Sequence, residues 1–168
     1  MTTATLQKPF VIARDLDAPR ELVFKMFTDA EHLRHWWGPK GFSISYITAD
    51  VRVGGVHHYS MRMPDGGEMW GKQVYREVTP VSRIVLVNSF SDKDGNLTRH
   101  PMAPVWPLEL LTTFTFDEIG RGKTRLTVTW LPINATDEEY TAFDQMRDSM
   151  TVGWTGTFEQ LEAYVATF

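Results

Sequence analysis

One histidine and one tyrosine have side-chain types and a spacing that could support catalysis. His57 and Tyr59 lie two residues apart in HHYSM, and in a strand this spacing places both side chains on one face. Imidazole titrates near neutral pH, so His57 is a candidate for acid–base work, with Tyr59 as a second candidate. The sequence favours the alternative that His57 is a hydrogen-bonded core histidine. No residue is therefore assigned as catalytic.

The sequence gives little indication of a metal-binding or phosphate-binding site. His32 and His35 lie three residues apart on an expected helix, next to Glu31, but no third strong ligand lies nearby. His57 and His58 are adjacent on an expected strand, so they face opposite sides and do not form a chelating pair. The chain has no Gly-x-Ser-x-Gly elbow, phosphate-binding glycine loop or zinc-protease motif. We predict no metal site and no cofactor.

Composition narrows the class of protein. The chain has 168 residues, a net charge of −4 and a pI of about 5.7, which argue for one soluble domain and against nucleic-acid binding. It has no cysteine, no apolar run long enough to span a membrane and no signal sequence at its start, so we expect a cytoplasmic protein. Residues 1–8 are expected to form a flexible tail and residues 9–168 a single domain.

The periodicity of apolar residues predicts an α+β domain with an antiparallel sheet. A strand and two short helices come first, about six strands follow, and a long helix ends the chain. Thr136 and Glu139 form a capping box at the start of this last helix, which we expect to run over 137–166 with a possible break near Asp144. The apolar character of residues 91–107 predicts a loop folded over the sheet edge or a pocket mouth, with a dimer contact as the alternative.

Two adjacent tryptophans stand where the second helix must turn into the sheet. Trp36 and Trp37 are followed by Gly38, Pro39 and Gly41, residues that allow the chain to reverse. We expect one of the two indoles to fill the core and fix the angle between helix and sheet. The alternative is that one ring lines the mouth of a pocket and stacks on a ligand.

Three segments resemble one known family. They are DAPRELVFKMFTDAEHLRHWWGP, the motif Asp50-x-Arg52-x-Gly54-Gly55 within ADVRVGGVHHYSMRMPDG, and GWTGTFEQLEAYV. Together they resemble the bacterial homologues of the activator of heat-shock protein 90 ATPase, in the START-like (SRPBCC, birch-pollen-allergen-like) superfamily. The resemblance covers about Phe10 to Val165. It implies the helix-grip fold, in which a curved sheet of about six to seven strands wraps around the long C-terminal helix and leaves a cavity between them.

Individual residues support such a cavity. Gly153 and Gly156 each cost about 1 kcal/mol in a helix interior, so either the sheet approaches closely there or space is left open. Methionine suits an adaptable apolar wall, although Met and Gly also fit a tight core. Polar side chains on the inward stripes would orient a ligand or bond one another. The predicted ligand-binding residues are Trp37, His57, Tyr59, Met61, Asn88, Phe90, Thr112, Phe114, Val128, Trp130, Met146, Met150, Gly153 and Trp154.

Three functions compete on this basis. The first is a small-molecule binding protein that holds a hydrophobic or amphipathic ligand between sheet and helix. The second is an enzyme of the same fold, a cyclase, dehydratase or hydrolase of polyketide-like aromatic substrates. The third, implied by the family name, is a co-chaperone-like stimulator of a partner ATPase. In the namesake protein this domain works beside another that we do not find here, so no chaperone partner is expected. A homodimer is a possible assembly.

Overall fold

The computed structural model describes residues 7–168. Of the tail predicted at residues 1–8, residues 1–6 lie outside the described residues. Strands and helices follow in the predicted order, with bounds within a few residues of those expected. They are β1 (Phe10–Leu16), α1 (Arg20–Thr28), α2 (Ala30–Trp36), β2 (Ser43–Ala49), β3 (Val56–Arg62), β4 (Glu68–Thr79), β5 (Arg83–Ser91), β6 (Leu97–Thr98), β7 (Leu110–Gly120), β8 (Lys123–Pro132), α3 (Asp137–Gln145) and α4 (Arg147–Val165).

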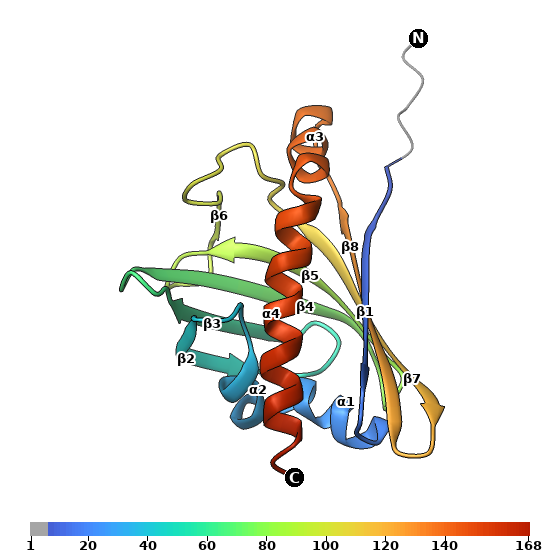
Figure 1. Cartoon of the computed structure of the whole chain (residues 1–168). Helices are drawn as coiled ribbons and strands as arrows, with labels where there is room; N and C mark the ends of the chain where they lie inside the picture. The colour runs from blue at the N-terminus through green and yellow to red at the C-terminus, as the bar shows by residue number, and fades with distance from the viewer. Residues whose placement is uncertain (1–6) are drawn as a thin grey trace.

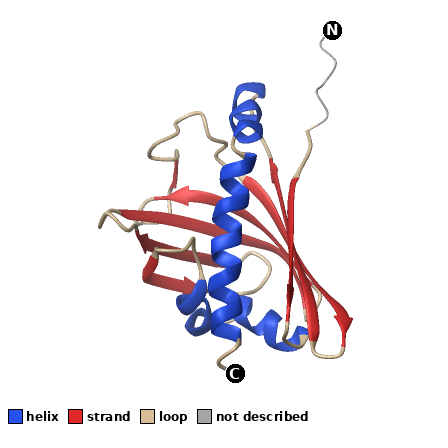
Figure 2. Ribbon diagram, viewed as in Figure 1, coloured by secondary structure: helices blue, strands red, loops and turns tan. Residues whose placement is uncertain are grey.

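The strands form one antiparallel sheet that curves around α4 (Figure 1). Its strand order is β1-β8-β7-β5-β4-β3-β2, and the two-residue strand β6 pairs with β5 outside this path. Figure 2 shows α4 lying along one face of the sheet, with α1 and α2 gathered near the C-terminal end of α4 and α3 at the other end. The α+β, helix-grip prediction is confirmed, and β6 is the element that the sequence did not predict.

The two tryptophans after α2 have different environments. Trp36 is almost completely buried, and its indole N–H donates to the carbonyl oxygen of Met26 at 3.2 Å. Trp37 follows the last residue of α2, and its ring meets that of Trp36 edge-on with 5.5 Å between ring centroids. Gly38 comes next with a φ of 107°, a left-handed conformation that glycine adopts without strain. Both indoles are therefore buried, Trp36 almost completely and Trp37 at 8% exposure.

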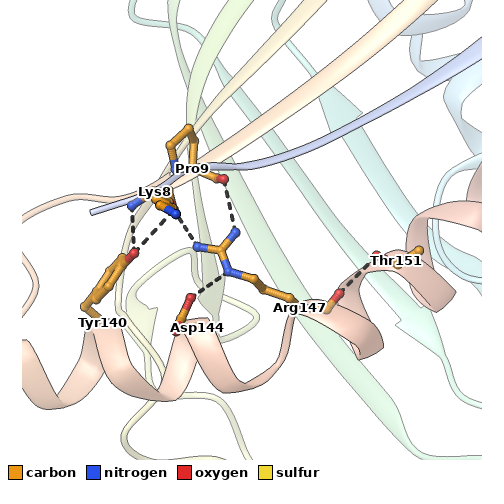
Figure 3. Close-up of polar contacts among 6 residues, drawn as sticks. All are labelled: Lys8, Pro9, Tyr140, Asp144, Arg147 and Thr151. Atoms are coloured by element: carbon orange, nitrogen blue, oxygen red, sulfur yellow. Dashed lines mark hydrogen bonds and ion pairs between the residues drawn. The ribbon is translucent and has the colours of Figure 1, made fainter. Parts of the chain in front are cut away.

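The C-terminal helix is broken, as the sequence allowed. The break falls at Met146, where φ is −103° and ψ is 13°, so α3 and α4 are separate helices. Figure 3 shows how Arg147 fixes the junction. Its guanidinium binds the Asp144 carboxylate at 2.6 Å and donates to the carbonyl oxygens of Pro9 and Lys8. Lys8, which we expected in the tail, is therefore attached to the helices, and its own N–H donates to the Tyr140 hydroxyl.

The motif Asp50-x-Arg52-x-Gly54-Gly55 forms a tight turn before β3. The Arg52 guanidinium binds the Asp50 carboxylate at 2.8 Å, and both side chains are largely exposed. A Cβ atom at Gly55 would collide with the backbone oxygen of Asp50, so this position requires glycine. The ion pair therefore belongs to the turn.

Candidate functional site

A chamber of about 350 Å³ lies between the concave face of the sheet and α4. This volume is at the lower end of the range of about 300–1,000 Å³ that ligand sites occupy. Its walls come from the turn after α2, from β3, β4, β5, β7 and β8, from the loop before β7, and from the first turns of α4. Most of the predicted residues lie on these walls: Trp37, Tyr59, Met61, Asn88, Phe90, Trp130, Met146, Met150, Gly153 and Trp154.

The other predicted residues lie behind the walls. Thr112, Phe114 and Val128 face inward, but all three are buried within the core and are not part of the chamber lining. Phe114 shows the reason, because its ring packs against Phe27 of α1 with 4.9 Å between centroids. An inward direction on the strands therefore means core where α1 packs and chamber wall only where the concave face is left open. The prediction that these three residues line the cavity is corrected.

His57 is also excluded from the chamber. Its ring lies beneath those of Trp37 and Tyr59, at centroid distances of 5.5 and 4.9 Å, and only 1% of the residue is exposed. Burial lowers the pKa of His57 to about 4, against which the hydrogen bond to Gln73 acts. The side chain is therefore neutral at pH 7. Its position corrects the prediction of a ligand-lining residue and agrees with the core histidine that the sequence favoured.

Tyr59 reaches the chamber because β4 makes room for it. Gly71 stands opposite Tyr59 in the β3–β4 pairing, and the phenol ring lies over this glycine where any Cβ atom would collide with it. Burial raises the pKa of Tyr59 to about 12, while an interaction with the Trp37 indole acts in the opposite direction. At neutral pH the phenol is protonated, so it can donate or accept a hydrogen bond at the chamber wall.

The loop between β6 and β7 covers part of the chamber, as its apolar residues predicted. His100, Ala103 and Trp106 line the wall, and the Trp106 ring packs on Phe143 of α3 with 5.8 Å between centroids. Arg99 holds the loop in place by donating both to the carbonyl oxygen of Trp106 and to the Glu139 carboxylate. Met146 lines the chamber and is still 44% exposed, so the opening lies beside the α3–α4 junction.

Sequence reasoning missed several wall residues. Those from loops and turns had no periodicity to reveal them, whereas Gln73 and Met69 could have been found from their alternation along β4. Ser149 and Thr157 lie on the same side of α4 as Met150 and Gly153, one turn from residues that were predicted. The missed residues are Gly38, Pro39, Phe42, Met69, Gln73, His100, Ala103, Trp106, Leu110, Ser149 and Thr157.

A short relay of hydrogen bonds links the buried histidine to the chamber. His57 Nδ1 lies 2.8 Å from Gln73 Oε1, and Gln73 Nε2 donates to Asn88 Oδ1 at 3.3 Å. Since Gln73 presents its oxygen, the neutral His57 ring must carry its proton on Nδ1. The second ring nitrogen, Nε2, is buried and has no partner among residues 7–168. Gln73 and Asn88 both belong to the chamber wall, so the relay ends there.

The two histidines of α2 are occupied by aromatic contacts. His32 Nδ1 lies 2.8 Å from the Tyr164 hydroxyl, and the His35 ring stacks on the Tyr164 ring with 4.8 Å between centroids. Within the described chain, no group of three or more His, Cys, Asp or Glu side chains is placed to hold a metal ion. No helix in that part of the chain is long and apolar enough to cross a membrane.

The two glycines of α4 differ in what surrounds them. A Cβ atom at Gly156 would lie 3.1 Å from the backbone nitrogen and from the Cβ of Lys40, so the turn after α2 approaches closely there. A Cβ atom at Gly153 would meet no atom within 4 Å, and Gly153 lines the chamber. Close approach of the neighbouring backbone therefore explains Gly156, and open space explains Gly153.

Gly153→Ala is expected to stabilise the protein by about 0.5–1 kcal/mol, because alanine favours the helix and its methyl group enters open space. Gly156→Ala is the matched variant, and it should be no more stable than the parent because its methyl group presses on Lys40. Urea unfolding of the three proteins at one pH measures both effects. Equal gains for the two variants would show that the helix approaches Lys40 less closely than described.

Comparisons with known proteins agree on a family and a fold. Residues 17–166 match the family model described as Activator of Hsp90 ATPase homolog 1-like protein. No protein with a curated description matches significantly. A crystal structure from Nitrosomonas europaea is 24% identical with a TM-score of 0.76, covering 98% of this chain and 97% of that one.

Two further solved structures share the fold. A protein of Mycobacterium smegmatis is 24% identical with a TM-score of 0.76, over 94% of this chain and 90% of its own. The AHSA1 protein of Silicibacter pomeroyi is 19% identical with a TM-score of 0.72, over 95% of this chain and 99% of its own. At these identities the similarity establishes a shared architecture and leaves the ligand and the reaction, if any, to be argued from the chamber.

Proposed function

The chain belongs to the family of Activator of Hsp90 ATPase homolog 1-like proteins, and from this premise we propose that it binds a small hydrophobic or amphipathic molecule in the chamber between sheet and α4. Gly153 is the observation that carries the proposal. Glycine in a helix interior costs about 1 kcal/mol relative to alanine, and at Gly153 no neighbouring atom requires it. The open space beside it is what a bound molecule would use.

The composition of the walls supports this function. Aromatic rings and methionines form most of the surface, and a few polar groups converge on it, which is the usual make-up of a small-molecule site. His57 has no part in the proposal as an acid or base, because it lies behind Trp37 and Tyr59 and is neutral. Binding rather than proton transfer is therefore the function that these side chains favour.

Titration with prodan, a neutral naphthalene ketone whose emission shifts to the blue in apolar surroundings, tests the proposal. We expect a saturable blue shift with a stoichiometry of one, together with quenching of tryptophan emission, because Trp37, Trp130 and Trp154 lie on the walls. Native mass spectrometry should show a one-to-one complex, or a co-purified molecule that prodan displaces. A linear, non-saturating response and a protein of unaltered mass would contradict the proposal.

A further inference from the structure

We infer that the chamber selects an uncharged ligand bearing a hydrogen-bond acceptor, such as a ketone carbonyl on an aromatic ring system, and that the Asn88 side-chain amide binds this acceptor. The inference rests on the proposed function and deepens it by naming the ligand class. It depends on two properties of the walls, which are the absence of charged groups and the direction in which the polar groups present their hydrogens.

The described part of the chain, residues 7–168, contributes no Asp, Glu, Lys or Arg to the chamber walls. Arg99 and Glu139, the ion pair that holds the covering loop, bind each other at 3.0 Å and are not part of the lining. A carboxylate or ammonium group inside the chamber would lose its water without gaining a counter-ion, which weakens binding. A neutral ligand avoids this cost.

The relay from His57 determines which group Asn88 presents. Gln73 Oε1 accepts from His57 Nδ1, so Gln73 must offer its NH₂ group to Asn88, and Asn88 Oδ1 accepts it at 3.3 Å. The remaining polar group of Asn88 is its own NH₂, which has no partner among the described residues and belongs to a side chain on the chamber wall. Asn88 therefore presents a donor and requires an acceptor.

His100 adds a second donor on the neighbouring wall. Its Nδ1 accepts the backbone N–H of Met102 at 3.0 Å, so the neutral ring carries its proton on Nε2. Burial lowers the pKa of His100, which keeps the ring neutral at pH 7. The ring packs against Phe90 with 4.6 Å between centroids, and both residues line the chamber.

The indole N–H groups do not add to this bias. Trp130 and Trp154 meet edge-on with 5.6 Å between centroids, and the N–H of each is buried, so a ligand in the chamber does not reach it. The hydroxyls of Tyr59 and Ser149 can donate or accept. The Asn88 amide and the His100 ring are therefore the groups that favour an acceptor, and an ammonium group would face their partially positive hydrogens.

Four naphthalenes with one substituent at the same ring position test the inference. They carry an acetyl, ethyl, carboxylate or methylene-trimethylammonium group, and each is measured by isothermal titration calorimetry at pH 7.5. We expect the acetyl compound to bind about tenfold more tightly than the ethyl compound, the worth of one well-placed hydrogen bond. The carboxylate and ammonium compounds should bind at least about tenfold more weakly than the acetyl compound.

Asn88→Leu should remove the tenfold preference for acetyl over ethyl while leaving the affinity for the ethyl compound within about twofold. Ser89→Ala, a change at the next position of β5 and outside the chamber lining, should keep the preference. If Asn88→Leu fails to fold, Asn88→Ala tests the same loss of preference, and a lowered infrared carbonyl stretch of the acetyl compound bound to the parent protein shows that this carbonyl accepts a hydrogen bond.

The outcomes separate this inference from the proposed function. Tightest binding by the carboxylate or the ammonium compound would overturn the neutral-ligand inference and leave small-molecule binding intact, and an ammonium preference would indicate an aromatic cage for cations instead. An unchanged acetyl preference in Asn88→Leu would overturn the role of Asn88. Failure of all four compounds and of prodan to bind would overturn the proposed function and this inference with it.

Discussion

Gly153→Phe is expected to abolish binding of prodan, with a loss of affinity of about 100-fold or more, equal to at least roughly 2.7 kcal/mol. Gly153 lines the chamber, and its missing side chain leaves open space there. A phenyl group on this side of α4 would occupy the volume that the ligand needs. Because phenylalanine is also a better helix former than glycine, the variant should keep at least the parent's stability.

Val152→Phe is the matched control, since it introduces the same side chain at the preceding position of the same helix. Val152 is 74% exposed and is not part of the chamber lining, so this variant should bind prodan within about twofold of the parent. Fluorescence titration measures affinity and urea unfolding measures stability for all three proteins. Undiminished binding by a folded Gly153→Phe protein would place the ligand outside the chamber and refute the proposed site.

The secondary structure was readable from the sequence because its signals are local. The Asp29 side chain caps α2 by accepting from Glu31 N–H at 2.9 Å, and the box of Thr136 and Glu139 caps α3. Both are short-range interactions that residue types alone indicate. The position of the α3–α4 break has no such local signal, because Arg147 fixes it through the carbonyl oxygens of Lys8 and Pro9, far away in the chain.

The sequence predicted only part of the chamber lining. Alternation along a strand shows which side chains face inward, but it does not show whether they reach the chamber or are covered by other side chains. Asn88 and Thr112 both face inward, yet one lies on the wall and the other is completely buried. What separates them is how closely other side chains cover each position, which alternation along a strand does not record. The wall residues from the covering loop, His100 and Trp106, depend on how that loop folds back, which no periodic pattern records.

Stability is expected to fall by about 1.4 kcal/mol between pH 7.5 and pH 5.5, because His57 is buried in its neutral form. Its pKa is about 4 in the folded protein and 6.5 as the reference value for an unfolded chain. Below pH 6.5 the unfolded chain therefore binds a proton that the folded protein does not. Stability rises with pH through the window from 4 to 6.5 and is fully present above it.

His57→Gln isolates this contribution. The variant retains an amide that can donate to Gln73 Oε1, and it removes the titrating ring. Urea unfolding at pH 5.5, 6.5 and 7.5 should show a flatter dependence in H57Q, with the remaining slope in part from His100, whose pKa is also lowered by burial. The same slope in both proteins would mean that His57 is protonated in the folded state.

The measurement also bears on how the chamber presents its polar groups. The Nδ1–H of the neutral His57 ring donates to Gln73 Oε1, and Gln73 Nε2 donates in turn to Asn88 Oδ1. The glutamine in H57Q can hold Gln73 in either amide orientation, so Asn88 would no longer be restricted to presenting its NH₂ group. We therefore expect H57Q to lose part of the preference for acetylnaphthalene as well as the pH dependence of stability, since both originate in one buried imidazole.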